Sequence, residues 1–148
     1  MLSIGDKAPK FKGLNQNGET VSLNDFKGKK LVLFFYPKDD TPKCTEVACN
    51  LRDNFSIFTK QNYTLLGVSA DSDKKHQKFI EKFNFPFDLI ADINHEICDL
   101  YGVWGLKKFM GREYYGIIRT TFVIDEKGVI SNILTDFKNK NHAAKILE

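Results

Sequence analysis

The chain has 148 residues, enough for one domain with a full hydrophobic core and too few for two. Its apolar fraction of 42%, charged fraction of 28% and net charge of +3 are ordinary for a globular protein and do not predict a nucleic-acid-binding surface. The longest apolar run, residues 31–36, is too short to span a bilayer, and the first residues lack the pattern of a signal peptide. Three cysteines do not suggest a disulfide scaffold. We therefore expect a single domain over residues 1–148, in a reducing cytoplasm, with no nucleic-acid or membrane partner.

The first half of the chain predicts a hairpin, a strand and a long helix. Asn17 and Gly18 are a strong turn signal within residues 11–23. Residues 31–36 are continuously apolar, which is typical of a central strand covered on both faces, and Pro37 ends it. A helix is expected over residues 42–60. Its buried face is predicted from apolar residues at helical spacing, namely Val47, Ala48, Leu51, Phe55 and Phe58.

In the second half, the pattern predicts strands alternating with helices, with Asp73 as the cap of one helix. The expected strands are residues 65–70, 87–91, 120–124 and 129–135, and the expected helices are residues 73–83, 94–101 and 141–147. Residues 102–116 are rich in glycine and aromatic residues and are predicted to form a long loop. This order indicates an α/β domain with a central mixed sheet, helices on both faces and an N-terminal hairpin, which fits a thioredoxin-like fold.

Cys44 lies where the first buried strand meets the first long helix, the usual place for a site in an open α/β sheet. Thr41 is a good N-cap and Pro42 fits the first helical position, so Cys44 becomes the third helical residue. Unpaired N–H groups and the positive end of the helix dipole favour a thiolate there. Acidic residues outnumber Lys38 and Lys43 nearby, so a further positive charge has to be supplied by the fold. The alternative is an inert cysteine in a helical first turn.

Cys49 follows five positions later on the polar side of the same helix. Ideal helix geometry separates the two Cα atoms by about 8.7 Å, whereas a disulfide tolerates roughly 7 Å. Cys44 and Cys49 can therefore bond only if the first turns of the helix unwind. The alternative is two unrelated thiols.

At this point the sequence resembles the peroxiredoxin family. The stretch Pro37-x-x-x-Thr41-x-x-Cys44 matches its active-site motif, and the position of Cys49 is similar to that in the peroxiredoxin Q type, also called the bacterioferritin comigratory protein type. The resemblance covers nearly the whole chain. Its further segments are Gly67-Val-Ser, Tyr101-Gly-Val-Trp-Gly105, Gly111-Arg-Glu-Tyr114 and Gly116-Ile-Ile-Arg119-Thr-Thr-Phe-Val-Ile-Asp125.

The resemblance implies a role for each motif residue. Cys44 would be the peroxidatic cysteine and Cys49 the resolving cysteine. Thr41 would hydrogen-bond the thiolate and the peroxide oxygen as well as cap the helix. Pro37 would shield the pocket from water, and Arg119 would contact the Cys44 sulfur and supply the missing charge.

The sequence departs from the family pattern at two positions. Lys43 stands where glycine usually precedes the peroxidatic cysteine. Val47 stands where a Glu or Gln usually follows it by three residues, and that polar group could have bonded to the arginine or to the helix.

The implied activity is that of a cofactor-free thiol peroxidase acting on hydrogen peroxide and organic hydroperoxides. A Cys44–Cys49 disulfide would form, and a thioredoxin-like protein would reduce it. Resemblance to this subgroup also implies a monomer. The alternatives are a peroxide sensor and a general thiol–disulfide oxidoreductase, although the Cys-x-x-Cys of the latter is missing from the sequence.

Other candidate residues receive structural interpretations. Cys98 is expected in the core rather than as a second resolving cysteine. Its spacing from His95 could place two metal ligands on one helix face, but no complementary pair follows, so no metal site is predicted. His76 and His142 are predicted to lie at the surface. A group of aromatic residues could line the pocket, receive the reductant or cover the core, namely Trp104, Phe109, Tyr114 and Tyr115.

Overall fold

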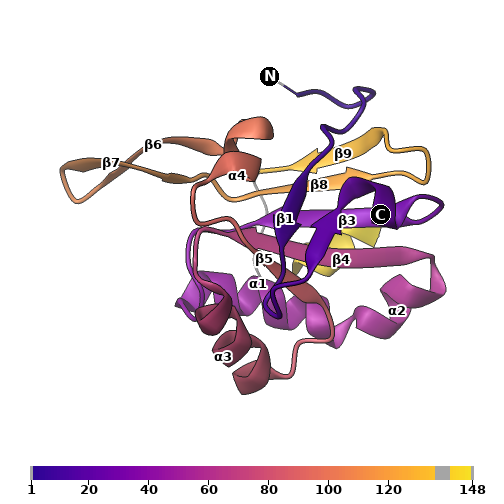
Figure 1. Ribbon diagram of the computed structural model, residues 1–148, viewed down its shortest axis with the longest axis horizontal. Helices are drawn as coiled ribbons and strands as arrows, with labels where there is room; N and C mark the ends of the chain where they lie inside the picture. The colour runs from indigo at the N-terminus through magenta and orange to yellow at the C-terminus, as the bar shows by residue number, and fades with distance from the viewer. Residues whose placement is uncertain (1, 136–140, 148) are drawn as a thin grey trace.

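The structure, a computed structural model, describes residues 2–135 and 141–147. Its centre is a five-stranded mixed sheet in the order β5-β4-β3-β8-β9 (Figure 1). β3 is parallel to β4, and β4 to β5, whereas β8 is antiparallel to both β3 and β9. The strands are β3 Lys30–Phe35, β4 Tyr63–Ser69, β5 Asp88–Ala91, β8 Thr120–Ile124 and β9 Ile130–Leu134. The central mixed sheet predicted from the sequence is confirmed.

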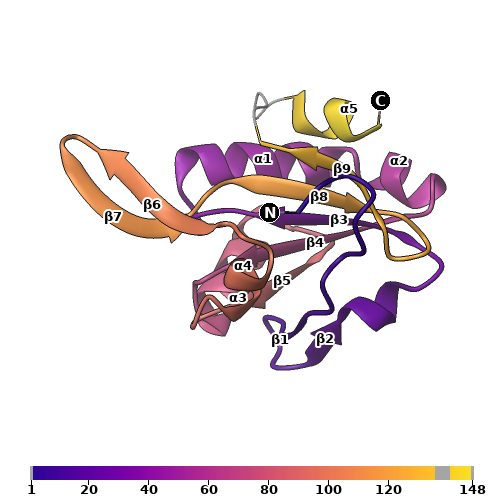
Figure 2. The same cartoon turned by 90° about the horizontal axis from the view of Figure 1, so that it is seen from above.

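Both faces of β3 are buried, as its continuous apolar sequence predicts. Alternate residues Leu31, Leu33 and Phe35 pack into one core cluster, and Val32 and Phe34 pack into a second. The second cluster is covered by α1 Pro42–Asp53, α2 Phe55–Lys60, α3 Asp73–Phe83 and α5 His142–Leu147. The first is covered by α4 Glu96–Leu100 and by the segment that contains β1 Lys12–Leu14, β2 Thr20–Ser22 and the 3₁₀ helix η1 Leu23–Phe26. Figure 2 shows α1, α2 and α5 along one side of the sheet, with the β1–β2 hairpin and α4 on the other.

The predicted helix over residues 42–60 is two helices, α1 and α2, separated at Asn54. The Asn54 side-chain amide donates to the carbonyl of Asn50, and its backbone N–H donates to Leu51. Asparagine competes in this way for the hydrogen bonds of a helix and favours its termination. The predicted cap of α3 is also displaced by one residue, because Ser72 rather than Asp73 is the N-cap and accepts from the Lys75 N–H.

The prediction of a loop over residues 102–116 is wrong. Strands β6 Trp104–Phe109 and β7 Arg112–Ile117 form an antiparallel hairpin that projects from the body of the molecule (Figure 1). Its two-residue turn has positive φ at both Met110 and Gly111, 51° and 79°, as a type I′ turn requires. Most of the hairpin side chains are exposed on both faces, so its strands lack the apolar alternation by which a strand is recognised.

The two histidines predicted at the surface are fully buried. His76 points inward from α3, although Lys74, Lys75 and Lys78 lie close to it in the sequence, because both of its ring nitrogens have hydrogen-bond partners in the interior. His142 contacts the Thr121 hydroxyl through Nε2 at 2.8 Å. Within the described ranges, no helix is long and apolar enough to cross a membrane.

Candidate active site

The nucleophile candidate, Cys44, is the third residue of α1, immediately beyond the carboxyl end of β3. Its side chain is 3% exposed and packs in the same cluster as Val47, Ala48 and Leu51. The first helical hydrogen bond runs from the Thr45 N–H to the Thr41 carbonyl, so Cys44 lies among N–H groups that have no partner within the helix. The helix start therefore favours a negative charge on the sulfur.

Arg119 approaches this sulfur from the other half of the chain. It lies between the end of β7 and the start of β8, and β8 pairs with β3 so that Thr120 faces Phe35. This register places Arg119 beside the carboxyl end of β3, where its Nη2 donates to Cys44 Sγ at 3.3 Å. Its Nη1 is buried and has no hydrogen-bond partner among the residues that the structure describes. The guanidinium thus supplies the cation that the sequence around Cys44 lacks, and the N–H donors of Nη1 stay unused.

Thr41 and Pro37 lie on the loop that joins β3 to α1, and both are half-buried. Thr41 is the N-cap residue of α1, but its hydroxyl donates to the Lys38 carbonyl at 2.9 Å and makes no side-chain cap bond. The expectation that the Thr41 side chain caps the helix is therefore wrong for this structure. The hydroxyl oxygen keeps lone pairs with which it can accept a hydrogen bond.

Lys107 is a second cation near the Cys44–Arg119 pair, and the sequence did not single it out. Its Nζ donates to the carbonyl of Ile117 at 2.9 Å, two residues before Arg119. Burial lowers the pKa of Lys107, the positive charge of Arg119 lowers it further, and Cys44 opposes both effects. The expectation of a loop hid this residue, because only the β6–β7 pairing brings Lys107 back toward the end of β7.

All three cysteines are free thiols in the structure. Cys49 is partly exposed and lies in α1 together with Cys44, so the two are separated by intact helix. Burial raises the pKa of Cys49, Arg52 lowers it and Asp53 raises it. Cys98 is a residue of α4 and is fully buried in the core, as expected, and burial raises its pKa strongly.

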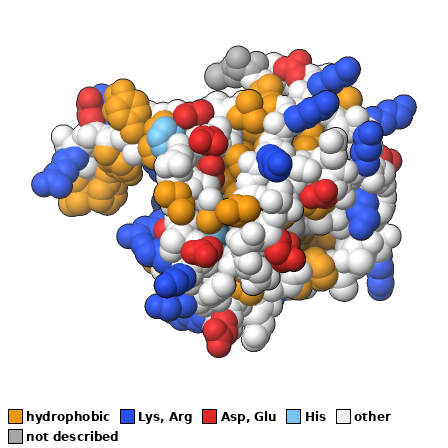
Figure 3. Space-filling model, in the orientation of Figure 1, with side chains coloured by type: hydrophobic (Ala, Val, Ile, Leu, Met, Phe, Trp, Pro, Cys, Tyr) orange, Lys and Arg blue, Asp and Glu red, His pale blue; other side chains and the backbone are white. Residues whose placement is uncertain are grey.

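Three of the four aromatic residues of the hairpin are exposed, whereas Trp104 packs against the core. Phe109, Tyr114 and Tyr115 are exposed, and Figure 3 shows hydrophobic side chains gathered on the projecting hairpin. Trp104 is half-buried and stacks on the His95 ring with 4.0 Å between centroids. His95 also bonds Asp99, and the described part of the chain holds no cluster of three His, Cys, Asp or Glu side chains placed for a metal ion.

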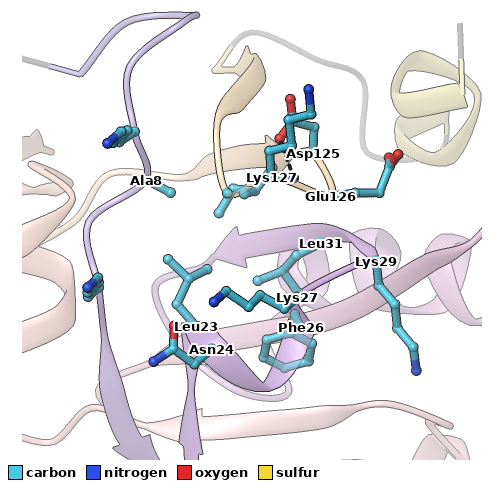
Figure 4. A pocket seen from close by; sticks show the side chains of 14 residues that line it. Ala8, Leu23, Asn24, Phe26, Lys27, Lys29, Leu31, Asp125, Glu126 and Lys127 are labelled. Carbon is cyan, nitrogen blue, oxygen red and sulfur yellow. Dashed lines mark hydrogen bonds between the residues drawn. The ribbon is translucent and has the colours of Figure 1, made fainter.

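A separate hollow of about 250 Å³ lies at the other end of the sheet (Figure 4). It is lined by Leu31 at the start of β3, by the η1 segment and by the turn after β8. Because Cys44 and Arg119 lie beyond the opposite end of β3, this hollow is separate from the cysteine chemistry.

Comparison with known proteins identifies the family of this chain. Residues 4–133 match the model of the AhpC/TSA family. The chain is 46% identical to peroxiredoxin Bcp of Bacillus subtilis over 99% of this chain and 94% of that protein, and 45% identical to peroxiredoxin Bcp of Escherichia coli with the same coverage. A cysteine-to-serine mutant of Xylella fastidiosa PrxQ superimposes with a TM-score of 0.93 at 30% identity, covering 99% and 94% of the two chains. Xanthomonas campestris peroxiredoxin Q superimposes with a TM-score of 0.86 at 32% identity, covering 93% and 87%. The chain therefore belongs to the AhpC/TSA family and, within it, to the peroxiredoxins of the Bcp, or peroxiredoxin Q, type.

Proposed function

We propose that Cys44 is the peroxide-attacking thiol of this thiol peroxidase and that Cys49 resolves the oxidised form. The observation that carries the proposal is the 3.3 Å hydrogen bond from Arg119 Nη2 to Cys44 Sγ at the start of α1. A thiolate is the attacking species, and a guanidinium beside a helix N-terminus stabilises it.

In the first step the Cys44 thiolate attacks one oxygen of the peroxide. An S–O bond forms, the O–O bond breaks, and the second oxygen leaves with a proton as water or as an alcohol. The sulfur becomes a sulfenic acid, oxidised by two electrons. Negative charge moves from the sulfur to the departing oxygen, so the unpartnered Nη1 of Arg119 is suited to binding a peroxide oxygen beside the sulfur.

Thr41 and Pro37 complete the proposed site from the loop before α1. With its proton donated to the Lys38 carbonyl, the Thr41 hydroxyl can accept a hydrogen bond from the peroxide, while Pro37 limits the access of water. A hydroxyl that donates to Lys38 has to rotate before it can donate to Cys44. We therefore assign Thr41 first to the peroxide oxygen and only secondarily to the thiolate.

In the second step the Cys49 thiolate attacks the Cys44 sulfenic acid. An S–S bond forms and hydroxide leaves, taking a proton to become water. The helical separation of about 8.7 Å exceeds the roughly 7 Å limit for a disulfide, so α1 has to open between the two residues. A dithiol reductant then returns two electrons and two protons and regenerates both thiols.

The substrates we propose are hydrogen peroxide and organic hydroperoxides. The Xanthomonas campestris bacterioferritin comigratory protein, 31% identical over 93% of this chain, has a structure described in connection with alkyl peroxide reduction. We assign the reductant role to a thioredoxin-like protein. The proposal further comprises a cofactor-free, single-domain monomer in the cytoplasm, with no nucleic-acid or membrane partner.

The deciding experiment mixes the reduced protein with one equivalent of hydrogen peroxide and maps the products by mass spectrometry. We expect a Cys44–Cys49 disulfide in the wild type, a Cys44 sulfenic acid in Cys49→Ser, and no peroxide consumption by Cys44→Ser. Retained consumption by Cys44→Ser would sink the assignment. Fast multiple turnover with thioredoxin and its reductase favours the enzyme, whereas a single slow oxidation favours a peroxide sensor.

A further inference from the structure

A buried network ties the loop before Cys44 to the rest of the fold. The two carboxylate oxygens of Asp39 have separate partners, since Oδ1 accepts from the Tyr36 hydroxyl and Oδ2 contacts Nδ1 of His76, both at 2.6 Å. His76 belongs to α3, and its Nε2 lies 2.8 Å from the carbonyl of Ile90 in β5. Asp39, His76 and Tyr36 are 8%, 0% and 2% exposed. The network therefore connects the loop to α3 and to β5 beneath the surface.

The hydrogen-bond partners restrict the roles of the ring nitrogens in this network. A carbonyl only accepts, so His76 Nε2 donates its N–H to Ile90, and Nδ1 shares a hydrogen bond with the carboxyl group of Asp39. Burial first, and then the charge of Asp39, raises the pKa of Tyr36 well above its usual value, which keeps its hydroxyl a donor. Buried polar groups are tolerated when they are hydrogen-bonded, as these three side chains are.

The remaining contacts of the loop also lead away from α1. The backbone N–H of Asp39 donates to Asp71 Oδ2 at 2.8 Å, and the same oxygen accepts from the Ser69 hydroxyl at the end of β4. Asp40 pairs with Lys82 of α3 at 2.9 Å in an exposed contact. The partners of residues 39 and 40 are outside α1, and they are Tyr36, Asp71, His76 and Lys82. The first turns of α1 can therefore come apart without breaking these hydrogen bonds and ion pairs.

We propose that Asp39 and His76 are a positioning pair, which fixes the loop before α1 so that the first turns of the helix unwind and rewind about a stationary end. This inference rests on the proposed peroxidase cycle, in which Cys44 has to leave α1 to meet Cys49. Five residues of extended chain span at most about 17 Å, so a fixed Asp39 limits how far the Cys44 sulfenic acid can move. It also returns Cys44 to Arg119 after reduction, in the geometry that the next attack needs.

The test compares four variants. Asp39→Asn keeps the hydrogen bonds, since its carbonyl can accept from Tyr36 and its amide can donate to Nδ1 of a neutral His76. The double variant Asp39→Ala/His76→Leu removes the pair, and replacing both partners of a buried hydrogen bond by apolar groups can be nearly neutral for stability. Tyr36→Phe removes the hydrogen bond to Asp39 Oδ1. It replaces the double variant in the comparison if the double variant does not fold. Lys82→Met is the matched control, because it removes only the exposed contact of the same loop.

The first readout is hydrogen–deuterium exchange of the amides of residues 38–41 and 43–45 in the reduced protein, without peroxide. We expect these amides to exchange about tenfold faster or more in the double variant, to an intermediate degree in Tyr36→Phe, and within about twofold of wild type in Asp39→Asn and Lys82→Met. Wild-type exchange in a folded double variant, or in Tyr36→Phe where the double variant does not fold, would overturn the proposal. Amide exchange in Asp39→Asn as fast as in the double variant would also overturn the proposal.

The second readout separates the two chemical steps after rapid mixing with hydrogen peroxide. The double variant should form the Cys44 sulfenic acid about tenfold more slowly, because Cys44 is no longer held beside Arg119, whereas disulfide formation should not slow. Equal slowing of both steps would indicate a general structural defect and contradict a positioning role. If peroxide fails to oxidise Cys44 in the wild type, the proposed function fails, and the exchange measurement still decides whether the pair holds the loop.

Discussion

Arg119 Nη2 donates to Cys44 Sγ across 3.3 Å although the two residues are 75 positions apart in the chain. The antiparallel pairing of β3 with β8 produces this contact, since it brings the start of β8 to the end of β3. The local sequence places Cys44 at the start of a helix, and the pairing of β3 with β8 brings the Arg119 guanidinium to it. The activation of Cys44 is therefore a tertiary property, and it should respond to changes in both elements.

Arg119→Met removes the guanidinium and leaves a side chain of comparable length. We expect the second-order rate with hydrogen peroxide to fall on the order of 100-fold, because a donor directed at the reacting charge is lost. Arg119→Lys should recover part of this loss, since it restores the positive charge but not the planar arrangement of guanidinium N–H donors. Stopped-flow measurement of peroxide consumption tests both, with the exposed hairpin residue Arg112→Met as the control. A loss below threefold in Arg119→Met would contradict the assignment.

Much of this site is predictable from the chain, but for different reasons. The continuous apolar run of β3 and the Thr41-Pro42 start of α1 are local signals, and they locate Cys44 correctly. Arg119 has no local signal and is found only through the family resemblance. Side chains on both faces of the β6–β7 hairpin are exposed, so its strands show no alternation of apolar and polar residues. The sequence pattern therefore predicts neither the hairpin nor the position of Lys107.

The burial of His76 is not predictable from its neighbours for a related reason. Lysines precede and follow it along α3, and the polar partners that stabilise it lie 37 and 14 residues away in the chain. A polar residue can face the core when such partners exist, and a sequence pattern does not display them. The nearby indication that this side of α3 is inward comes from Phe79 and Ile80, three and four residues later on the same face.

Val47→Glu introduces the polar type that the family usually has at this position. Cys44 precedes Val47 by three residues, so both side chains lie on the same face of α1. Arg119 Nη1 has no hydrogen-bond partner within the described residues. We expect the new carboxylate to bond to that donor and to change the free energy of unfolding by less than about 1 kcal/mol. Leu51→Gln, one turn on and fully buried, should cost at least about 3 kcal/mol because it gains no such partner. Urea denaturation compares the two, and equal destabilisation would contradict the prediction.

Lys107→Met removes the second cation near the Cys44–Arg119 pair. Because its charge acts on the sulfur through space rather than through a hydrogen bond, we expect the peroxide rate to fall roughly threefold, and less at high salt. Lys107→Arg should restore it. Lys108→Met is the matched control, since its side chain is exposed and pairs with Glu113 at 3.5 Å. A salt-independent rate difference between Lys107→Met and wild type would indicate lost packing instead.

Cys98→Ala should leave the redox cycle intact. Burial raises the pKa of the Cys98 thiol and excludes reagents, so the group is a poor nucleophile. We expect wild-type peroxide turnover, an unchanged Cys44–Cys49 disulfide on peptide mapping, and a loss of less than about 2 kcal/mol in stability. In the native wild type, iodoacetamide should modify the partly exposed Cys49 well before Cys98. A disulfide that contains Cys98 would contradict this prediction and give Cys98 a resolving role.

His142 should make the stability of the fold depend on pH. Burial first, and then the charge of Arg119, lowers its pKa from 6.5 to about 4. Between these values the unfolded chain binds more protons than the folded one, so the contribution is complete above pH 6.5 and is lost as the pH falls toward 4. The loss amounts to at most about 3 kcal/mol. His142→Gln cannot titrate and can still accept from the Thr121 hydroxyl. Urea denaturation at pH 7 and pH 4.5 should therefore show a smaller acid loss in the variant, and equal losses in both proteins would contradict the prediction.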